Sequence, residues 1–161
     1  MAFDTFLKLG DIKGESTVKG FEDQIQVSSW SWGMSQSGTT HTGTGGGAGK
    51  VNVADISITH NVDAASPNLL IACCTGQHFD SATLTMRKAG GSALEYVKLE
   101  LTEVIVTNVS HGGHGGEDSL AESFALNFAQ FKFTYQPQDA KGAKKGGAIV
   151  GSYHIANNVK S

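Results

Sequence analysis

The sequence is poor in cysteine, proline and charged residues. It contains only two cysteines and two prolines among 161 residues, and charged side chains make up 17% of it. This composition excludes a disulfide-rich scaffold, a Pro-rich linker and a highly charged disordered chain. The formal net charge of −3 provides no basic field for binding nucleic acid or an anionic membrane surface. The length predicts a single domain over residues 1–161.

Long apolar runs are also missing. No segment approaches the ~18 apolar residues that a membrane-spanning helix requires, so we expect no membrane insertion. The first eight residues, MAFDTFLK, lack the basic start and apolar stretch of a secretory signal. The adjacent Cys73 and Cys74 cannot easily reach disulfide geometry, so both are expected to be free thiols, as in cytoplasmic proteins. We therefore expect synthesis in the cytoplasm and, if the protein is secreted, export without a signal peptide.

Alternation of apolar and polar residues is the main pattern that is present, and it changes phase three times. Apolar residues move from odd to even positions within residues 24–33, 51–61 and 94–109. In the last of these, Leu99 and Leu101 are odd whereas Val104 and Val106 are even. A strand with one buried face accommodates such a change at a β-bulge, where an extra residue reverses the later side chains. The pattern predicts a mainly β protein whose two packed antiparallel sheets form a barrel-like domain.

One short helix is predicted within residues 66–76. Ser66 is a plausible N-cap, Pro67 suits the first turn and Gly76 suits the left-handed stop. The segment between them is apolar nearly all round, so a helix this short needs cover on several sides. We interpret it either as a cap on the core or as a surface facing another subunit.

Residues 117–135 allow two interpretations. Ser119 and Glu122 have capping-box spacing, and Phe124, Phe128 and Phe131 recur at helical intervals. Alternation over the same residues is equally compatible with strands, and spacing alone leaves the choice open.

A glycine-rich tract occupies residues 43–50, but it does not fit a phosphate-binding loop. Thr44 stands where a Walker A motif needs glycine, and Val51 stands where the motif needs Ser or Thr. The tract also leads into an expected strand, whereas a nucleotide loop opens a helix. Residues 35–50 are therefore predicted to form an extended Gly-rich loop.

Candidate catalytic groups are sparse. His111 and His114 have ligand-like spacing, with Glu117 and Asp118 nearby, but the intervening glycines provide no rigid frame. The chain lacks a Gly-x-Ser-x-Gly nucleophile elbow. We predict that the protein is not an enzyme and has no cofactor. The alternatives are a small metal-dependent enzyme using these histidines and a carbohydrate-binding β-sandwich module.

Several phrases in a fixed order resemble the haemolysin co-regulated protein (Hcp) family of type VI secretion. They are DTFLKLGDIKGES at residues 4–16, WSWG at 30–33 with Ser35-Gln36, ATLT at 82–85, RKAGG at 87–91, GED at 116–118 and LNFA at 126–129. Each phrase alone is weakly specific, but together they cover most of the chain. Tyr153-His154-Ile155 departs from the family's pattern near the end.

The resemblance implies a structural subunit of the type VI secretion inner tube. Such subunits assemble as hexameric rings that stack into a tube inside a contractile sheath and export small effector proteins. The implied partners are further copies of the chain, a spike protein at the tube tip, the sheath and the effectors. The resemblance also places residues 117–135 in strands.

Three groups of residues are then candidates for assembly. Ser31 lies between two tryptophans and is predicted to face away from them, either towards the lumen and its effectors or towards the outer wall of the ring. The extended loop is expected to contact an adjacent ring, through Ser35, Gly45, Gly46, Gly47 and Lys50. The helix is expected to line the lumen or the seam between subunits, through Leu69, Leu70, Cys73 and Cys74.

Overall fold

The computed structural model describes residues 3–38, 49–88 and 94–161. Over these residues the protein is mainly β with a single helix, α1 (Ser66–Thr75), which confirms the predicted class. The strands are β1 (Phe3–Leu9), β2 (Ile25–Val27), β3 (Ser29–Ser31), β4 (Met34–Ser35), β5 (Asn52–Val53), β6 (Ile56–Asn61), β7 (His78–Lys88), β8 (Glu95–Gly112), β9 (Ala121–Tyr135), β10 (Ile149–His154) and β11 (Val159–Lys160). In the described part of the chain, no helix is both long enough and apolar enough to cross a membrane.

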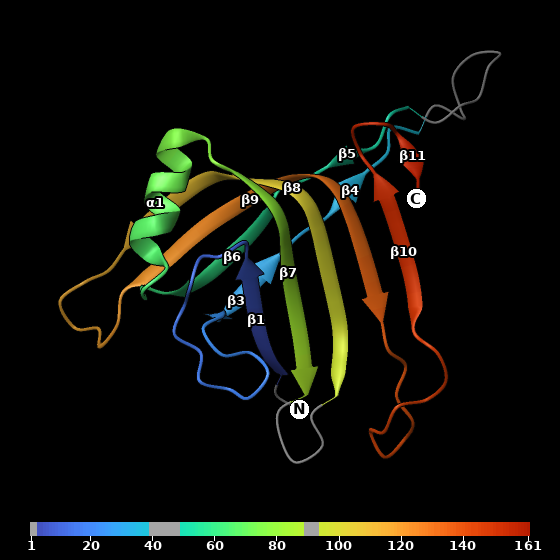
Figure 1. Ribbon diagram of the computed structural model, residues 1–161, viewed down its shortest axis with the longest axis horizontal. Coiled ribbons are helices and arrows are strands. Elements are labelled where there is room, and N and C mark those ends of the chain that lie inside the picture. Colours follow the sequence, from blue (N-terminus) through green and yellow to red (C-terminus); the bar gives the residue numbers. More distant parts are fainter. Residues whose placement is uncertain (1–2, 39–48, 89–93) are drawn as a thin grey trace.

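The strands form one large antiparallel sheet and a small ribbon. The nine-stranded sheet has the order β11-β10-β9-β8-β7-β1-β2, with β6 pairing with both β9 and β3, while β4 and β5 pair separately. β9 pairs with two different strands along one of its edges: residues 121–126 pair with β6, and residues 130–135 pair with β10. Figure 1 shows the sheet folding over, with β3 and β6 running across the direction of β1 and β7.

The two packed layers predicted from the sequence therefore belong to one folded sheet. β2 pairs with β1 and β3 pairs with β6, and a break at Ser28 separates these two short strands. Over the described residues the sheet curls without closing into a barrel.

The predicted phase change within β8 is confirmed, but its cause differs from the expected bulge. Leu101 and Val104 are both buried, on opposite parities. The register with β9 stays the same from Leu101↔Phe131 to Val104↔Phe128, so no residue is inserted here. Glu103 lies between them with a φ of 55°, in the left-handed region that side chains seldom occupy. The strand is turned locally at Glu103, and a true register shift occurs only a few residues later.

The core lies between the folded halves of the sheet. Its largest completely buried side chains are Phe6, Phe124, Leu7, Leu9, Ile25, Ile56, Ile58, Leu69, Leu84, Leu99, Leu101 and Leu126. Trp32 packs against this core, with its ring edge-on to Phe131 at 5.0 Å between centroids. Its Nε1 donates a hydrogen bond of 3.0 Å to the carbonyl oxygen of Ala54, which satisfies the one polar atom of the indole.

α1 begins and ends close to where the sequence predicts. Gly76 follows it with φ 65° and ψ 34°, the left-handed stop, and Pro67 lies in its first turn. The N-cap is Ala65, so the prediction that Ser66 caps the helix is wrong by one residue. No side chain caps the first turn, but Asp63 Oδ1 accepts the backbone N–H of the N-cap residue Ala65 at 2.8 Å and so fixes the turn that leads into the helix.

Candidate interaction surfaces

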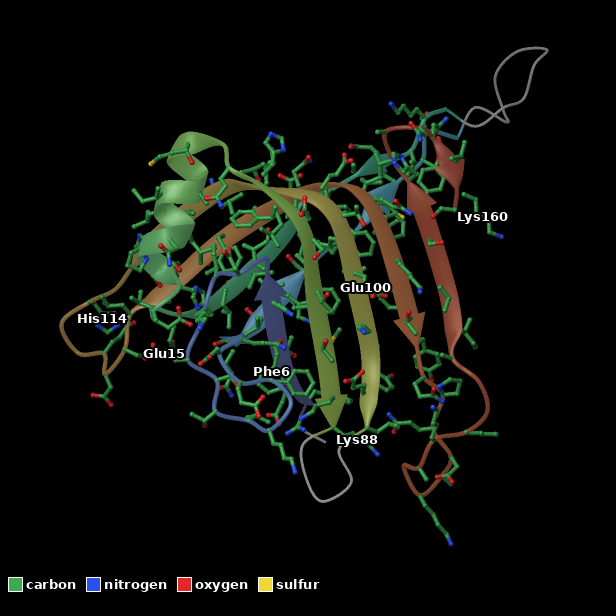
Figure 2. All side chains as sticks on the ribbon, in the orientation of Figure 1. Phe6, Glu15, Lys88, Glu100, His114 and Lys160 are labelled. Carbon is green, nitrogen blue, oxygen red and sulfur yellow. The ribbon has the colours of Figure 1, made fainter. Side chains whose placement is uncertain are left out.

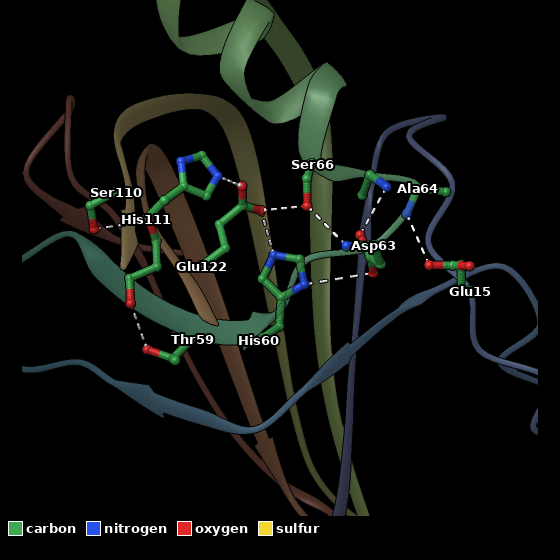
Figure 3. A network of polar contacts seen from close by, with 11 residues as sticks. Glu15, Thr59, His60, Asp63, Ala64, Ser66, Ser110, His111 and Glu122 are labelled. Carbon is green, nitrogen blue, oxygen red and sulfur yellow. Dashed lines mark hydrogen bonds and ion pairs between the residues drawn. The ribbon is translucent and has the colours of Figure 1, made fainter. Parts of the chain in front are cut away.

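A buried carboxylate ties α1 to three strands of the sheet. The side chain of Glu122, on β9, is 0% exposed. Its Oε1 accepts hydrogen bonds from His60 Nε2 on β6, at 2.6 Å, and from Ser66 Oγ on α1, at 3.0 Å. Its Oε2 pairs with Nε2 of His111 on β8 (Figure 3). We call these four residues, together with Asp63, the Glu122 cluster.

The pairing register explains how three of these side chains meet. His60 lies opposite Glu122 in the β6–β9 pair, and His111 lies opposite Glu122 in the β8–β9 pair. The three residues therefore form a row across adjacent strands, where side chains on one face are in contact distance. The inward position of His60 follows that of Ile56 and Ile58, at the period of a strand.

Asp63 completes the cluster on the far side of the His60 ring. Its Oδ2 lies 3.6 Å from His60 Nδ1, which is completely buried and has no hydrogen-bond partner in the described residues. Burial raises the pKa of the Asp63 carboxyl above its ordinary value, and the Ala65 N–H and the His60 ring oppose the shift. The His60 ring thus lies between two carboxylates.

An apolar groove opens directly above this cluster, between α1 and the β8–β9 hairpin. Its apolar lining comes from Val62, Pro67, Leu70 and Leu120, and its polar lining includes Asp63, Ser66 and His111. Val62, Leu70 and Leu120 are large apolar side chains that are exposed to solvent. Pro67, in the first turn of α1, is also exposed. The neighbouring Ile71, on the outer face of α1, is 60% exposed. Exposed apolar residues gathered in this way mark an interaction surface.

The two histidines considered from the sequence as metal ligands, His111 and His114, both line the groove but pair with different carboxylates. His111 turns to Glu122, whereas His114 Nε2 pairs with Glu117 Oε1 at 3.0 Å. Over the described residues, no three His, Cys, Asp or Glu side chains are arranged to hold a metal ion.

Further exposed apolar side chains lie at the other end of the molecule. Ile149 and Val150 at the start of β10 and Val159 on β11 are all exposed, with Ile149 at 62%. Ile149 and Val150 are consecutive and face opposite sides of the strand, and Val159 pairs with His154 at the other end of β10. We call these three residues the β10–β11 patch. Figure 1 shows α1 and the β10–β11 pair at opposite ends of the longest axis, and in Figure 2 the labelled His114 and Lys160 mark the same two ends.

The helix residues singled out from the sequence divide between core and surface. Leu69 is completely buried in the core, so its side chain is not part of the exposed face. Leu70 and Cys74 are exposed, and Cys73 is half-buried with its thiol free.

Ser31 is exposed, and it lies between half-buried tryptophans as the alternation predicts. It pairs with Ser57 of β6, while Ser29 pairs with Thr59. The outward positions of β3 and β6 thus carry small hydroxyl side chains without charge. Neither the Glu122 cluster nor this hydroxyl face was identified as a unit from the sequence.

The extended loop is described only at its two ends. Ser35 and Lys50 are exposed, and the β4–β5 ribbon pairs the segments that lead into and out of it. Gly45, Gly46 and Gly47 lie outside the described residues.

Comparison with known proteins finds relatives of the whole chain in a secretion apparatus. Residues 6–135 match the model of a family described as "Type VI secretion system effector, Hcp". The chain is 56% identical over 162 residues to the protein hcp1 of Pseudomonas aeruginosa, covering 100% of both. A structure of a type six secretion system protein is similar with a TM-score of 0.93 at 30% identity, over 99% of this chain and 100% of that one. The crystal structure of Hcp1 from Salmonella typhimurium has a TM-score of 0.82 at 38% identity, over 100% of both chains.

Proposed function

The chain belongs to the Hcp family and is a tube subunit of the type VI secretion system, and we propose that it works by closing head to tail with five further copies into a ring. The observation that supports this arrangement is the pair of different apolar surfaces at opposite ends of the subunit. A head-to-tail ring joins two unlike patches on every subunit and leaves no patch uncovered when it closes.

In this proposal the groove of one subunit receives the β10–β11 patch of the next. Leu70 and Leu120 would contact Val150 of the neighbour, removing exposed apolar surface from water on both sides. Six copies carry a formal charge of −18 (6 × −3), so closure must depend on such local apolar contact rather than on bulk attraction. Ile71 and Cys74, on the exposed face of α1, would lie at the edge of the same seam.

The hydroxyl face around Ser31 is the surface that we propose for the lumen. Small uncharged side chains at Ser29, Ser31 and Ser57 would let a small effector protein pass or rest without strong electrostatic attachment. A Ser31→Gln variant tests this idea, since a bulky amide at this position should reduce effector retention while rings still form. Full effector retention by that variant would contradict the lumen position.

The remaining parts of the proposal concern assembly beyond one ring. We propose that rings stack through the extended loop, whose exposed ends are Ser35 and Lys50, and that the tube meets a spike protein at its tip and a contractile sheath around it. The protein would be made in the cytoplasm and secreted through this apparatus without a signal peptide. Its role would be structural, without catalysis or a cofactor.

Negative-stain microscopy together with native mass spectrometry tests the ring directly. We expect annular particles with the mass of six chains. In a Leu70→Asp variant we expect a folded subunit that no longer forms rings, because the charge would be buried in the seam. The matched control is Asn68→Asp, which adds the same charge to an exposed position of the same helix outside the groove. Unfolding of Leu70→Asp alone would show that this residue serves the core instead.

A further inference from the structure

The Glu122 cluster connects every element that borders the groove. Glu122 comes from β9, and its three donors come from β6, β8 and α1. Glu122 itself is completely buried and does not line the groove, whereas Ser66 and His111 belong to both the cluster and the groove wall. A change at Glu122 can therefore reach the groove only through the position of the elements that it holds.

The carboxylate of Glu122 has three hydrogen-bond partners, and this number favours its ionised form over a protonated carboxyl. An ionised carboxylate accepts all three hydrogen bonds, whereas a protonated carboxyl would have to place its own hydrogen against a donor. A buried carboxylate also needs a nearby positive charge, because its desolvation is costly. The two imidazole rings are the basic groups in contact with Glu122, and the side chain of His111 is 41% exposed.

We infer that the Glu122 cluster is a buried clasp that positions α1 and the β8–β9 hairpin, and so sets the shape in which the groove accepts the neighbouring subunit. This inference rests on the proposed ring. Glu122, His60 and His111 are positioning residues in it, since the contact with the neighbour is made by the apolar groove lining.

The clasp includes the ionisable side chains that surround Glu122. The titratable groups that face Glu122 are His60 from β6 and His111 from β8, and Asp63 faces the opposite side of the His60 ring. Glu15, from the segment after β1, lies beyond them, where its Oε2 accepts the Ala64 N–H at 3.1 Å. Loss of one of the partners of Glu122 should therefore loosen the elements that border the groove and weaken ring assembly.

The test compares Glu122→Gln and His111→Gln with the unchanged chain. The apparent dissociation constant of the ring is measured by native mass spectrometry or sedimentation, and folding of each subunit is checked by circular dichroism. We expect each variant to weaken assembly about tenfold, which corresponds to about 1.4 kcal/mol, while the subunit stays folded. His78→Gln, which removes an exposed imidazole on β7 away from the groove, is the matched control and should leave both readouts unchanged.

Two results would overturn the clasp. One is normal assembly in both variants, and the other is an equal loss of assembly in His78→Gln. If Glu122→Gln fails to fold, His111→Gln decides the matter, because its ring is partly exposed and its replacement leaves the His60 and Ser66 contacts in place. Absence of rings from the unchanged chain would instead refute the proposed function, and with it the premise of the clasp.

Discussion

Both halves of β9 direct side chains into the same interior, but one half contributes a polar cluster and the other contributes aromatic rings. Residues 121–126, beside β6, bring the carboxylate of Glu122 into contact with two imidazoles and a hydroxyl. Residues 128–135, towards β10, bring Phe128 and Phe131 into edge-on contact with each other and with the indole of Trp32. One strand therefore carries both a directional polar interior and a non-directional apolar one.

The difference predicts how each half responds to change. An apolar interior tolerates a side chain of similar volume, because dispersion contacts have no partner to leave unsatisfied. A buried charge depends on each of its partners, so losing one leaves the others desolvated and unpaired. A substitution in the polar half of β9 should therefore lower the free energy of unfolding more than a substitution in the aromatic half.

The largest effect is expected from Glu122→Leu. This change leaves the completely buried His60 ring without its carboxylate, and we expect a loss of about 3–5 kcal/mol in the free energy of unfolding. Urea unfolding of single-copy samples measures it. The matched control, Glu117→Leu, removes the carboxylate paired with the exposed His114 and should cost less than about 1 kcal/mol. Equal effects of the two changes would contradict the contrast between buried and exposed pairs.

A double variant sharpens the same point. Glu122→Leu combined with His60→Leu replaces the buried pair by apolar side chains, and we expect it to recover most of the stability lost in the single variant. If the double variant is less stable than the single one, the His60 ring contributes through packing, including its edge-on contact with Phe124, rather than through charge.

A smaller effect is expected from Phe128→Leu in the aromatic half. The two side chains are similar in volume, and the surrounding rings can adjust, so the expected loss is about 1 kcal/mol. Urea unfolding again provides the measurement, with Phe3→Leu as the control at an exposed aromatic position. A loss as large as that of Glu122→Leu would mean that the aromatic half is no more tolerant than the polar one.

The smallest effect is expected from Asp63→Asn, and its sign depends on pH. Because the pKa of Asp63 is raised in the folded protein, protonation of this carboxyl favours the folded state. Ionisation therefore costs stability as the pH rises above about 4, and the amide removes that cost. We expect the free energy of unfolding to rise by less than about 1 kcal/mol at pH 7.5, because the lost attraction to His60 limits the gain. This gain should shrink towards zero near pH 4. A gain that grows on acidification would contradict this sign.

The sequence predicted the fold where its patterns were local. Pro67 and Gly76 marked the helix, and the parity change between Leu101 and Val104 marked the turn of the sheet. The choice between helix and strand for residues 117–135 stayed open on spacing alone, because Phe124, Phe128 and Phe131 fit both periods. Pairing with β6, β8 and β10 decides it in favour of a strand.

The Glu122 cluster could not be predicted from the sequence, because it forms only when β6, β8 and β9 pair in this register. His60 shares the parity of Ile56 and Ile58, and Glu122 shares that of Phe124 and Leu126, which marks both as inward positions. No local signal relates residue 60 to residue 122 or to residue 111. The capping-box interpretation of Glu122 was wrong because tertiary pairing, rather than the spacing from Ser119, determines its role.

Mixing two assembly-deficient variants tests the head-to-tail seam most directly. Leu70→Asp blocks the groove and Val150→Asp blocks the β10–β11 patch, so each folded variant alone should remain a single copy. An equimolar mixture still contains one intact groove and one intact patch, and native mass spectrometry should find heterodimers that contain one chain of each variant and grow no further. A mixture that stays single-copy while both variants are folded, or a ring formed by either variant alone, would contradict the pairing of these two surfaces.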